Sequence, residues 1–427
     1  MEKKKTFMKR FITVLTLMAM ASGATAQLKP RADAFPPVEE NLGAKAVTMA
    51  TTVEEMAGWD RYPTYDTYLE MMRRWAEAYP TLCHVDTIGT SVQGRLILSM
   101  YIDPQTDADL YRPEFFYSST IHGDEVTGYV MMLRLIDTLL SSYGTSPDLT
   151  ALMDRTRISI NPLANPDGTY WRGNNTVQGS RRYNANNIDL NRNYPDPFST
   201  ATKSMPQENQ AMIDYFTAHR FRLSANLHGG AEVMNYPWDS YPSYLNPHPA
   251  AEWWEDVCRR FVDTARVYGS SHFRDVTTSG YTAGGDWYVI GGGRQDYVNY
   301  YHDCLEMTME ISSQKTLSSD RLPEYWHFLA PSFIGYIGEI HSLPGSVDVP
   351  LVEGRRLTVF PNPAVDRVTV AGLPEGSQIE LLDLTGRRVP LTVTERHDGT
   401  ATLDFGSLKP GLYLLRTPEG TAKMVKR

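Results

Sequence analysis

The sequence contains few cysteines, no excess of basic residues and no apolar run long enough to cross a membrane. Only three of the 427 residues are cysteines, so at most one internal disulfide can form and a disulfide-stabilised scaffold is excluded. The formal net charge of −9 argues against a nucleic-acid-binding protein, because contacts with phosphates need a basic face. A hydrophobic fraction of 41% and a charged fraction of 21% are ordinary for a globular protein with a full-sized core.

The N-terminus carries a basic segment followed by a short apolar run, residues 11–21. A membrane-spanning helix needs about 20 apolar residues, so this run is too short to span a bilayer. Ala24 and Ala26 form the small-x-small pattern of a signal-peptidase site, and no cysteine directly follows the run, as a lipoprotein anchor would need. We expect residues 1–26 to be a signal peptide, removed from an exported chain without a transmembrane segment. The alternative is a buried N-terminal helix.

The rest of the chain divides by its periodicity into a leader, a large domain and a small one. Residues 27–57 have no regular period and are interpreted as a leader or linker. Between residues 58 and 345, short apolar runs alternate with segments of helical periodicity, which predicts an α/β domain with a mixed, mainly parallel central sheet flanked by helices. The expected strands are residues 95–102, 114–121, 157–160, 221–227 and 304–311, and the expected helices are residues 65–79, 126–143, 207–219, 252–267 and 324–341.

Residues 357–427 follow a different pattern, in which short segments of alternating apolar and polar residues recur between turns that contain Gly and Pro. Strands at a spacing of about ten residues are typical of a small β-sandwich. We therefore expect an all-β C-terminal domain, joined to the α/β domain by a linker of residues 346–356.

Candidate metal ligands lie at the ends of two expected strands. His122 and Glu125 are three residues apart at the turn that follows strand 114–121, and His228 follows strand 221–227. In sheets of this kind, ligands bind beyond the carboxyl ends of the strands. Catalytic zinc takes three protein ligands and keeps a fourth position open. Each motif alone is more often structural than metal-binding, so the assignment depends on its context.

Two arginines, Arg182 and Arg192, lie ten residues apart among asparagines. Guanidinium groups bind carboxylates through paired hydrogen bonds, so this segment suits recognition of an anion. Without further context a solvated polar loop is the better interpretation. Glu310 lies within the apolar strand 304–311, where a charged residue is either at an exposed edge or functional.

Together these motifs resemble the zinc carboxypeptidases of the funnelin type, the family of carboxypeptidases A and B. Residues 182–196 and 227–239 are most similar to the carboxypeptidase N/E/D branch, and the motifs follow the family order over roughly residues 60–345. The resemblance implies the zinc carboxypeptidase fold and one Zn²⁺ per chain, held by His122, Glu125 and His228. The substrates would be the C-termini of peptides or proteins.

The resemblance also implies roles for other residues. Arg182 would face the developing oxyanion, and Glu310 would be the general base. Asn191 and Arg192 would bind the terminal carboxylate of the substrate. Tyr288, which lies 22 residues before Glu310, would close over the substrate, and the glycines near it suit a mobile loop.

Asp239 and Gln295 stand at positions that, in the N/E/D branch, resemble the floor of the pocket for the C-terminal side chain. A carboxylate there would pair with a basic head group, which predicts release of C-terminal Lys or Arg. The alternative is that Asp239 only caps a turn beside Pro237. Asn187 stands where many relatives have Gly, which concerns turn geometry rather than chemistry.

The C-terminal region resembles a type IX secretion sorting domain. Residues 359–363 read Val-Phe-Pro-Asn-Pro, residues 383–387 read Asp-Leu-Thr-Gly-Arg, and the chain ends in Met-Val-Lys-Arg. The resemblance implies export through the periplasm to the cell surface or the medium, with the secretion machinery as a partner. A carbohydrate-binding or stabilising module is the alternative, but the region has no aromatic cluster for sugar stacking.

The sequence thus predicts a secreted, zinc-dependent metallocarboxypeptidase. One alternative is a cell-wall peptidase of the same fold that acts on murein stem peptides. Another is a surface-binding protein that has lost catalysis, although the joint presence of the three candidate ligands and Glu310 argues against it.

Overall fold

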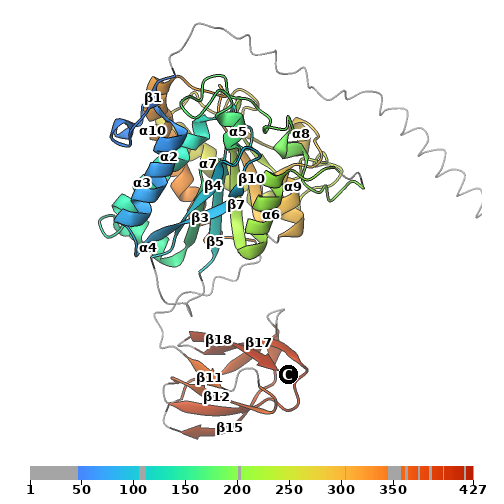
Figure 1. Cartoon of the computed structure of the whole chain (residues 1–427). Coiled ribbons are helices and arrows are strands. Elements are labelled where there is room, and N and C mark those ends of the chain that lie inside the picture. Colours follow the sequence, from blue (N-terminus) through green and yellow to red (C-terminus); the bar gives the residue numbers. More distant parts are fainter. Residues whose placement is uncertain are drawn as a thin grey trace, which may run out of the picture. The chain divides into compact units, whose positions relative to one another are not determined.

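The computed structural model describes residues 47–104, 112–200, 203–302, 304–344, 357–360, 364–373, 376–383, 387–397, 399–417 and 420–426. The chain divides into two compact units, Met1–Ser346 and Val347–Arg427 (Figure 1). The expected signal peptide, residues 27–46 of the expected leader and the linker 346–356 lie outside the described residues. No helix in the described part of the chain is long and apolar enough to cross a membrane.

The first unit is built on an eight-stranded sheet. Its strands are β3 (Cys83–Thr90), β4 (Leu96–Ile102), β5 (Glu114–Ser119), β6 (Arg157–Asn161), β7 (Phe221–His228), β8 (Ala231–Tyr236), β9 (Tyr281–Ala283) and β10 (Leu305–Ser312), in the order β3–β4–β6–β5–β7–β10–β8–β9. The central strands β6, β5, β7 and β10 are parallel, whereas the pairings β3–β4, β4–β6 and β8–β10 are antiparallel. The predicted mixed, mainly parallel sheet is confirmed.

Both faces of this sheet carry an apolar core. Successive residues of a strand point to opposite faces, and accordingly Phe115 and Tyr117 of β5 join one core while Phe116 joins the other. The first core takes residues from α2 (Tyr65–Ala78), α3 (Thr127–Ser142), α7 (Ala251–Tyr268) and α10 (Leu322–Gly338), and the second from α6 (Gln207–Ala218) and α9 (Arg294–Tyr301). Helices α3 and α6 lie on opposite sides of the strands in Figure 1.

Shorter elements complete the first unit. They are β1 (Met49–Ala50), η1 (Glu54–Met56), β2 (Tyr62–Pro63), α4 (Pro147–Arg155), α5 (Pro166–Thr169), η2 (Leu190–Arg192), α8 (Gly284–Trp287), η3 (Ser319–Arg321) and η4 (Glu339–His341). Residues 47–57, which the sequence pattern places in the leader, belong to this unit, because β1 pairs with β2 and Met56 is buried. Two-residue strands and a single helical turn are too short to produce a periodic pattern.

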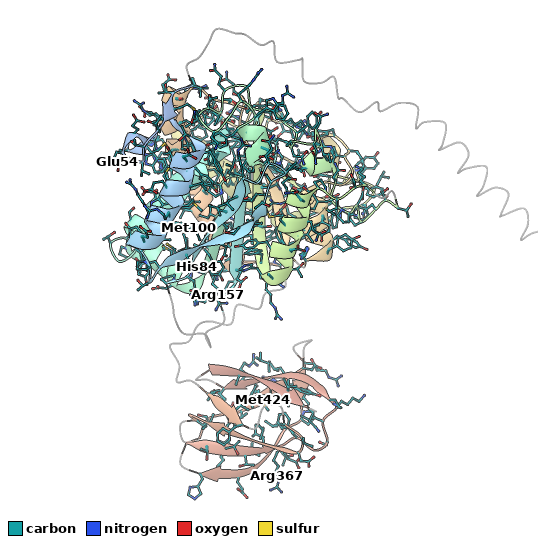
Figure 2. All side chains as sticks on the ribbon, in the orientation of Figure 1. Glu54, His84, Met100, Arg157, Arg367 and Met424 are labelled. Carbon is teal, nitrogen blue, oxygen red and sulfur yellow. The ribbon has the colours of Figure 1, made fainter. Side chains whose placement is uncertain are left out.

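The second unit contains two four-stranded antiparallel sheets, β11–β12–β16–β15 and β14–β13–β17–β18. The strands are β11 (Thr358–Phe360), β12 (Arg367–Ala371), β13 (Glu380–Leu382), β14 (Arg388–Val389), β15 (Thr392–His397), β16 (Thr400–Asp404), β17 (Gly411–Thr417) and β18 (Gly420–Lys426). Apolar residues from both sheets share one core, to which Met424 belongs, whereas Met100 lies in a core of the first unit (Figure 2). The predicted all-β C-terminal region is confirmed.

Candidate active site

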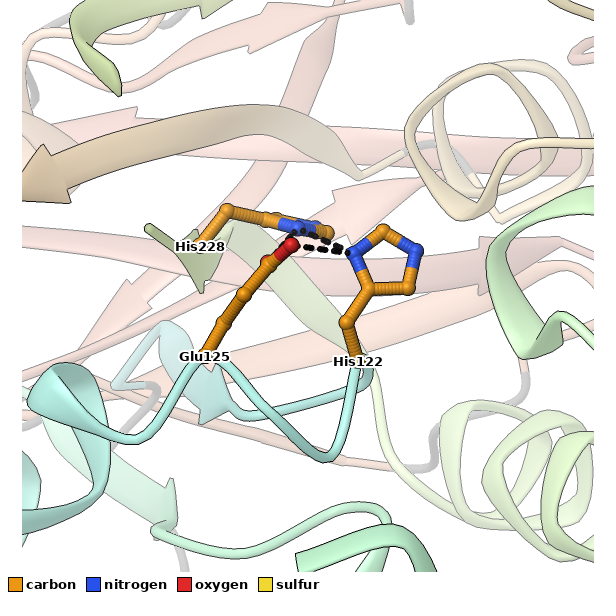
Figure 3. Close-up of side chains that lie close together, drawn as sticks. All are labelled: His122, Glu125 and His228. Atoms are coloured by element: carbon orange, nitrogen blue, oxygen red, sulfur yellow. Dashed lines mark hydrogen bonds and ion pairs between the residues drawn. The ribbon is translucent and has the colours of Figure 1, made fainter. Parts of the chain in front are cut away.

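The candidate metal ligands lie at the carboxyl ends of two neighbouring parallel strands. His122 and Glu125 are in the turn between β5 and α3, and His228 is the last residue of β7. The register places Ser119 of β5 opposite Leu227 of β7, so the turn and His228 meet at one edge of the sheet. All three side chains point toward one another in Figure 3, and each is almost fully buried.

The turn that carries His122 and Glu125 is held by the neighbouring helix α5. Asn165 caps α5 by accepting a hydrogen bond from the Gly168 amide (3.0 Å), and its Nδ2 donates to the carbonyl of Ile121 (3.1 Å). Thr169 donates to the carbonyl of Gly123 (2.9 Å). A Cβ atom on Gly123 would lie 2.4 Å from the backbone of Gly168, so the two segments can approach only because this position is glycine.

The possible ligand atoms form a compact group. The Nδ1 atom of His228 lies 3.1 Å from Nδ1 of His122 and 2.8 Å from Oε2 of Glu125, and Nδ1 of His122 lies 3.0 Å from Oε1 of Glu125. The atoms all lie within 4.8 Å of one another. Ligands about 2.0–2.1 Å from a tetrahedral zinc are separated by about 3.3 Å, so these spacings are close to what zinc requires.

The outer nitrogens of both imidazole rings face hydrogen-bond acceptors. Nε2 of His228 lies 2.6 Å from Oδ1 of Asn226, and Nε2 of His122 lies 3.2 Å from Oδ1 of Asp189. Burial lowers the pKa of His228 to about 4, so its ring is neutral at neutral pH. With both Nε2 atoms donating, both Nδ1 lone pairs face the Glu125 carboxylate, and three electron-pair donors that converge in this way fit a cation.

Glu310 lies next to this group, on β10. The parallel register of β10 and β7 pairs Glu310 with His228. The pKa of Glu310 is raised well above its usual value, mainly by burial and secondly by the negative charge of Glu125. Among the described residues its Oε2 atom has no hydrogen-bond partner. A carboxyl group with one unengaged oxygen beside the ligands is suited to accept and return a proton.

Arg182 is linked to the same group through Asp189. Its Nε atom donates to Oδ2 of Asp189 (2.9 Å), and its Nη1 atom lies 3.5 Å from Oε1 of Glu125. Burial opposes ionisation of Asp189, but the hydrogen bond from His122 and the nearby positive charges outweigh it, so its pKa lies below the usual value. Asp189 therefore ties the candidate oxyanion-binding arginine to a candidate ligand.

Asn191 and Arg192 follow Asp189 in the short helix η2. The backbone amide of Asn191 donates to Oδ1 of Asp189 (3.0 Å), which fixes the start of this turn. Oδ1 of Asn191 accepts from the amide of Arg294 (2.9 Å), and Arg192 Nη1 donates to the carbonyl of Asn191 (2.8 Å). Preceding this turn, Asn187 has a φ of 60°, the left-handed conformation that a glycine would adopt without strain.

Tyr288 directly follows α8 and is partly buried. Burial raises the pKa of its hydroxyl, and the charges of Glu310, Arg192 and Asp239 act on the same hydroxyl. Tyr288 is therefore close enough to these three groups for their charges to act on its hydroxyl. The glycines around it include Gly284 and Gly285 of α8, and a Cβ on Gly285 would lie 1.9 Å from the carbonyl oxygen of Tyr241, so the close approach of these two segments requires glycine. The mobility of this segment stays a prediction.

Asp239 and Gln295 are brought together in a buried polar pair. Nε2 of Gln295 donates to Oδ1 of Asp239 (2.9 Å), and its Oε1 accepts from the amide of Thr308 (2.6 Å). The pKa of Asp239 is raised well above its usual value, mainly by burial and secondly by the negative charge of Asp296. Asp296 accepts from the amides of Asp239 and Ser240 (2.8 and 2.9 Å), so the turn is capped by Asp296 and not by the Asp239 carboxylate.

The sequence pattern gave no role to three charged residues of this site. Asp189 lies within the asparagine-rich motif. Its position as an acidic residue between Arg182 and Arg192 is the sequence feature from which a role could have been predicted. Asp296 directly follows Gln295. Lys315, whose Nζ lies 3.1 Å from Asp124 and 3.4 Å from Glu125, follows β10 in a segment without a recognisable motif.

Comparison with known proteins identifies relatives of both units. Residues 68–335 match the family profile described as zinc carboxypeptidase, and residues 358–427 match the profile described as secretion system C-terminal sorting domain. Carboxypeptidase D of Anas platyrhynchos is 34% identical over an alignment of 282 residues that covers 63% of this chain and 20% of that protein. Carboxypeptidase M of Mus musculus is 34% identical over an alignment of 306 residues that covers 66% of each chain.

Solved structures share the fold of the first unit. Carboxypeptidase A from Helicoverpa armigera has a TM-score of 0.57 at 19% identity and covers 68% of this chain and 76% of its own. Thrombin activatable fibrinolysis inhibitor has a TM-score of 0.56 at 15% identity, over 66% of this chain and 75% of its own. At these identities the likeness concerns the fold alone. The chain spans about a fifth of the length of the carboxypeptidase D relatives it matches.

Proposed function

Because the chain belongs to the zinc carboxypeptidase family, we propose that it is a zinc-dependent exopeptidase that hydrolyses the last peptide bond of peptides or proteins. One observation carries this proposal: His122, Glu125 and His228 converge beside Glu310 at the carboxyl ends of parallel strands. Relatives named carboxypeptidase D and carboxypeptidase M support the same reaction class.

The metal would be one Zn²⁺ per chain, held by His122, Glu125 and His228. When bound, zinc would polarise the scissile carbonyl and favour attack by water. Asn226 and Asp189 keep the two imidazole rings in the orientation in which their Nδ1 atoms face Glu125. Outer partners of this kind typically contribute a factor of about 10–100 to metal affinity.

Glu310 would move the proton in this reaction. Its unengaged Oε2 atom can take a proton from the attacking water and return it to the leaving amine. Arg182, held by Asp189 on one side, would direct its guanidinium toward the oxyanion that develops on the scissile carbonyl. A donor in such a position typically stabilises the transition state by roughly 3–4 kcal/mol.

The substrate's terminal carboxylate would bind to Arg192 and the side-chain amide of Asn191. Oδ1 of Asn191 is engaged by the Arg294 amide, so its Nδ2 group is directed to the other side and can donate to an anion. The requirement for a free carboxylate would make the enzyme an exopeptidase. Tyr288, whose hydroxyl is influenced by the charges of Glu310, Arg192 and Asp239, would cover the bound residue.

The preferred C-terminal residue would be Lys or Arg. The Asp239 carboxylate is buried, is oriented by Gln295 and is not used to cap its own turn. A basic head group would pair with the ionised carboxylate and oppose the rise of its pKa, whereas beside an apolar side chain Asp239 would either stay charged without a countercharge or have to take up a proton. An unpaired buried charge is disfavoured by several kcal/mol, and each factor of ten in selectivity corresponds to about 1.4 kcal/mol.

A peptide series that differs only in its last residue tests the function and the pocket separately. Ends of Lys, Arg, Phe and Leu, and a Lys end with an amidated carboxylate, are incubated with the zinc-loaded full chain, and the released residue is quantified. We expect kcat/KM for Lys and Arg to exceed that for Phe and Leu by about a hundredfold, with no release from the amidated peptide or after chelation. In Asp239→Ala the preference should be lost while bound zinc is unchanged.

Each alternative predicts a different result when murein stem peptides are added to this series. Faster release of Phe or Leu would contradict the pocket assignment but not the catalytic one. Release only from murein stem peptides would favour the cell-wall peptidase. A zinc-loaded chain that cleaves none of these substrates would favour a binding protein without catalysis.

The C-terminal sorting domain implies export of the chain to the cell surface or the medium. We propose that residues 1–26 direct passage across the inner membrane and that the C-terminal domain then engages the secretion machinery from the periplasm. The presence of a sorting domain agrees with an extracellular peptidase.

A further inference from the structure

Two rows of polar side chains run along adjacent strands beneath the candidate metal site. Alternate residues of a strand face the same side of the sheet, and here both rows face α9. The paired positions are Ser224 with Glu306, Asn226 with Thr308 and His228 with Glu310. All six residues are buried. The rows therefore lead from the interior of the domain to its candidate catalytic groups.

A continuous set of hydrogen bonds connects His228 to a buried ion pair. Nδ2 of Asn226, whose Oδ1 faces His228, donates to Oε1 of Glu306 (3.1 Å). Ser224 donates to the other oxygen of Glu306 (2.8 Å). Arg294 of α9 donates from Nε and Nη2 to the two oxygens of Glu306, both at 2.9 Å. The side chains of Arg294 and Glu306 are completely buried.

Stability alone does not explain this ion pair. Replacing a buried ion pair by apolar side chains is often neutral or stabilising, because transferring two charges out of water is unfavourable. The position of the pair has a chemical consequence, however. The Glu306 carboxylate only accepts hydrogen bonds and is the nearest acceptor of Nδ2 of Asn226, at 3.1 Å, ahead of Thr308 Oγ1 (3.3 Å) and the Met307 carbonyl (3.4 Å), so it holds Nδ2 toward itself and Oδ1 toward His228. Nε2 of His228 must then carry the proton, and Nδ1 keeps its lone pair.

We propose that Glu306, held by Arg294, is a positioning residue that acts through Asn226 to keep His228 in the tautomer that can bind the metal. The proposal rests on the proposed function, because it takes His228 as a zinc ligand. The same arginine also donates its backbone amide to Asn191 (2.9 Å) and precedes Gln295 in α9. One buried residue thus connects the metal ligand with the groups proposed to bind the substrate.

The first test is the zinc affinity of Glu306→Gln in the full chain, measured by competition with a chelator. The glutamine amide would present a donor to Asn226, which would favour the flipped Asn226 amide and the other tautomer of His228. We expect the zinc dissociation constant to rise about 10–100-fold, with a similar rise in Asn226→Ala. A matched control is Glu232→Gln, which neutralises a buried carboxylate that binds His272 and Tyr325 on the opposite face of the sheet, and which should leave zinc affinity unchanged.

A double variant separates positioning from stability. Glu306→Gln alone leaves the buried Arg294 without its countercharge, whereas the double variant Arg294→Met with Glu306→Gln contains neither charge. The midpoint of thermal unfolding should therefore be higher in the double variant than in Glu306→Gln. Zinc affinity should stay low, because Asn226 still lacks its carboxylate. Recovery of zinc affinity together with the midpoint would overturn the proposal.

The tautomer can be observed directly in the metal-free protein. ¹⁵N-histidine spectra, with His228 assigned by its loss in His228→Gln, should show Nε2 protonated in the wild type and a mixture of tautomers in Glu306→Gln and in the double variant. Unchanged tautomers would overturn the proposal. A wild type that binds no zinc would instead contradict the proposed function, whereas a wild type and a Glu306→Gln variant with equal zinc affinity would reject this inference alone.

Discussion

Single side chains in the candidate site have distinct tasks although they lie within a few ångströms of one another. Glu125 and Glu310 are both buried glutamates, yet Glu125 is engaged by both histidines and Glu310 keeps one oxygen unengaged. The first arrangement suits a metal ligand and the second suits a proton acceptor. The two roles can therefore be separated by substitution.

Glu310→Gln should keep the metal and lose turnover. The amide has nearly the same shape as the carboxyl group but cannot accept a proton, so kcat should fall by about 10²–10⁴ while KM and bound zinc remain similar. Turnover of a Lys-ended peptide and zinc per chain are the measurements. Turnover at the wild-type rate would show that another residue is the base.

Asp189→Asn should weaken both the metal site and transition-state stabilisation. Asp189 accepts hydrogen bonds from His122, Arg182 and the amide of Asn191. Replacing one carboxylate oxygen by an amide group removes an acceptor, so zinc affinity should fall by about 10–100-fold. We expect kcat/KM to fall as well, even at saturating zinc.

The control for Asp189→Asn is Asp196→Asn in the same loop. The Asp196 carboxylate accepts from the backbone amide of Phe198 (2.9 Å), and no contact of it with a candidate ligand is found among the described residues. Its substitution should leave zinc affinity unchanged. Equal effects of the two substitutions would mean that Asp189 acts only on the stability of the loop.

Sequence motifs could predict the candidate ligands but not the network behind them. His122, Glu125, His228 and Glu310 belong to local patterns at strand ends, which a resemblance can identify. The contact of Asn226 with Glu306 depends instead on the register of two strands that are distant in the chain. No local pattern encodes such a register, so the hydrogen bonds behind the candidate ligands could be identified only from the structure.

Among the elements, the glycine-containing segment around α8 has a packing role that the sequence pattern did not predict. Its first glycine lets the backbone approach polar side chains closely. A Cβ atom on Gly284 would lie 1.9 Å from Oδ1 of Asp239 and 2.5 Å from Oδ1 of Asn235. The first residue of α8 thus forms one wall of the proposed pocket.

Gly284→Ala should therefore disturb specificity without removing the metal. The added methyl group must displace Asp239 or shift α8, so we expect kcat/KM for Lys-ended peptides to fall at least about tenfold, with zinc per chain unchanged. Gly335→Ala in α10 is the control, because a Cβ there meets nothing within 4 Å. If both variants behave alike, α8 does not shape the pocket.

Long helices and the central strands could be predicted from periodicity, whereas several short elements could not. Strand β8 is buried along its whole length, so it lacks the alternation that marks a half-buried strand. Strand β9 has three residues and α8 has four, too few for any period. Strand β15 in the second unit is exposed throughout, which also removes the alternation.

At the scale of the whole molecule, chemistry and export are assigned to different units. Every residue proposed for the site lies in the first unit, which has its own sheet and two cores. The second unit has a separate core and matches a sorting domain. The two functions should therefore be separable.

Deletion of residues 347–427 should leave an active enzyme that is not delivered to the cell surface. We expect the truncated chain to accumulate in the periplasm and to release Lys from peptides at a rate similar to that of the full chain. Cell fractionation followed by the peptide assay measures both. Surface delivery of the truncated chain would contradict a sorting role for the second unit.

The register that pairs Glu310 with His228 also limits how this lineage can diverge. Side chains alternate between faces along a strand, so inserting or deleting one residue within β7 or β10 would turn one partner away from the other. Length changes in the connecting loops carry no such penalty. Descendants of this chain can therefore gain or lose residues in loops that carry no site residue, while the span from Ser224 to His228 and that from Glu306 to Glu310 must keep their length.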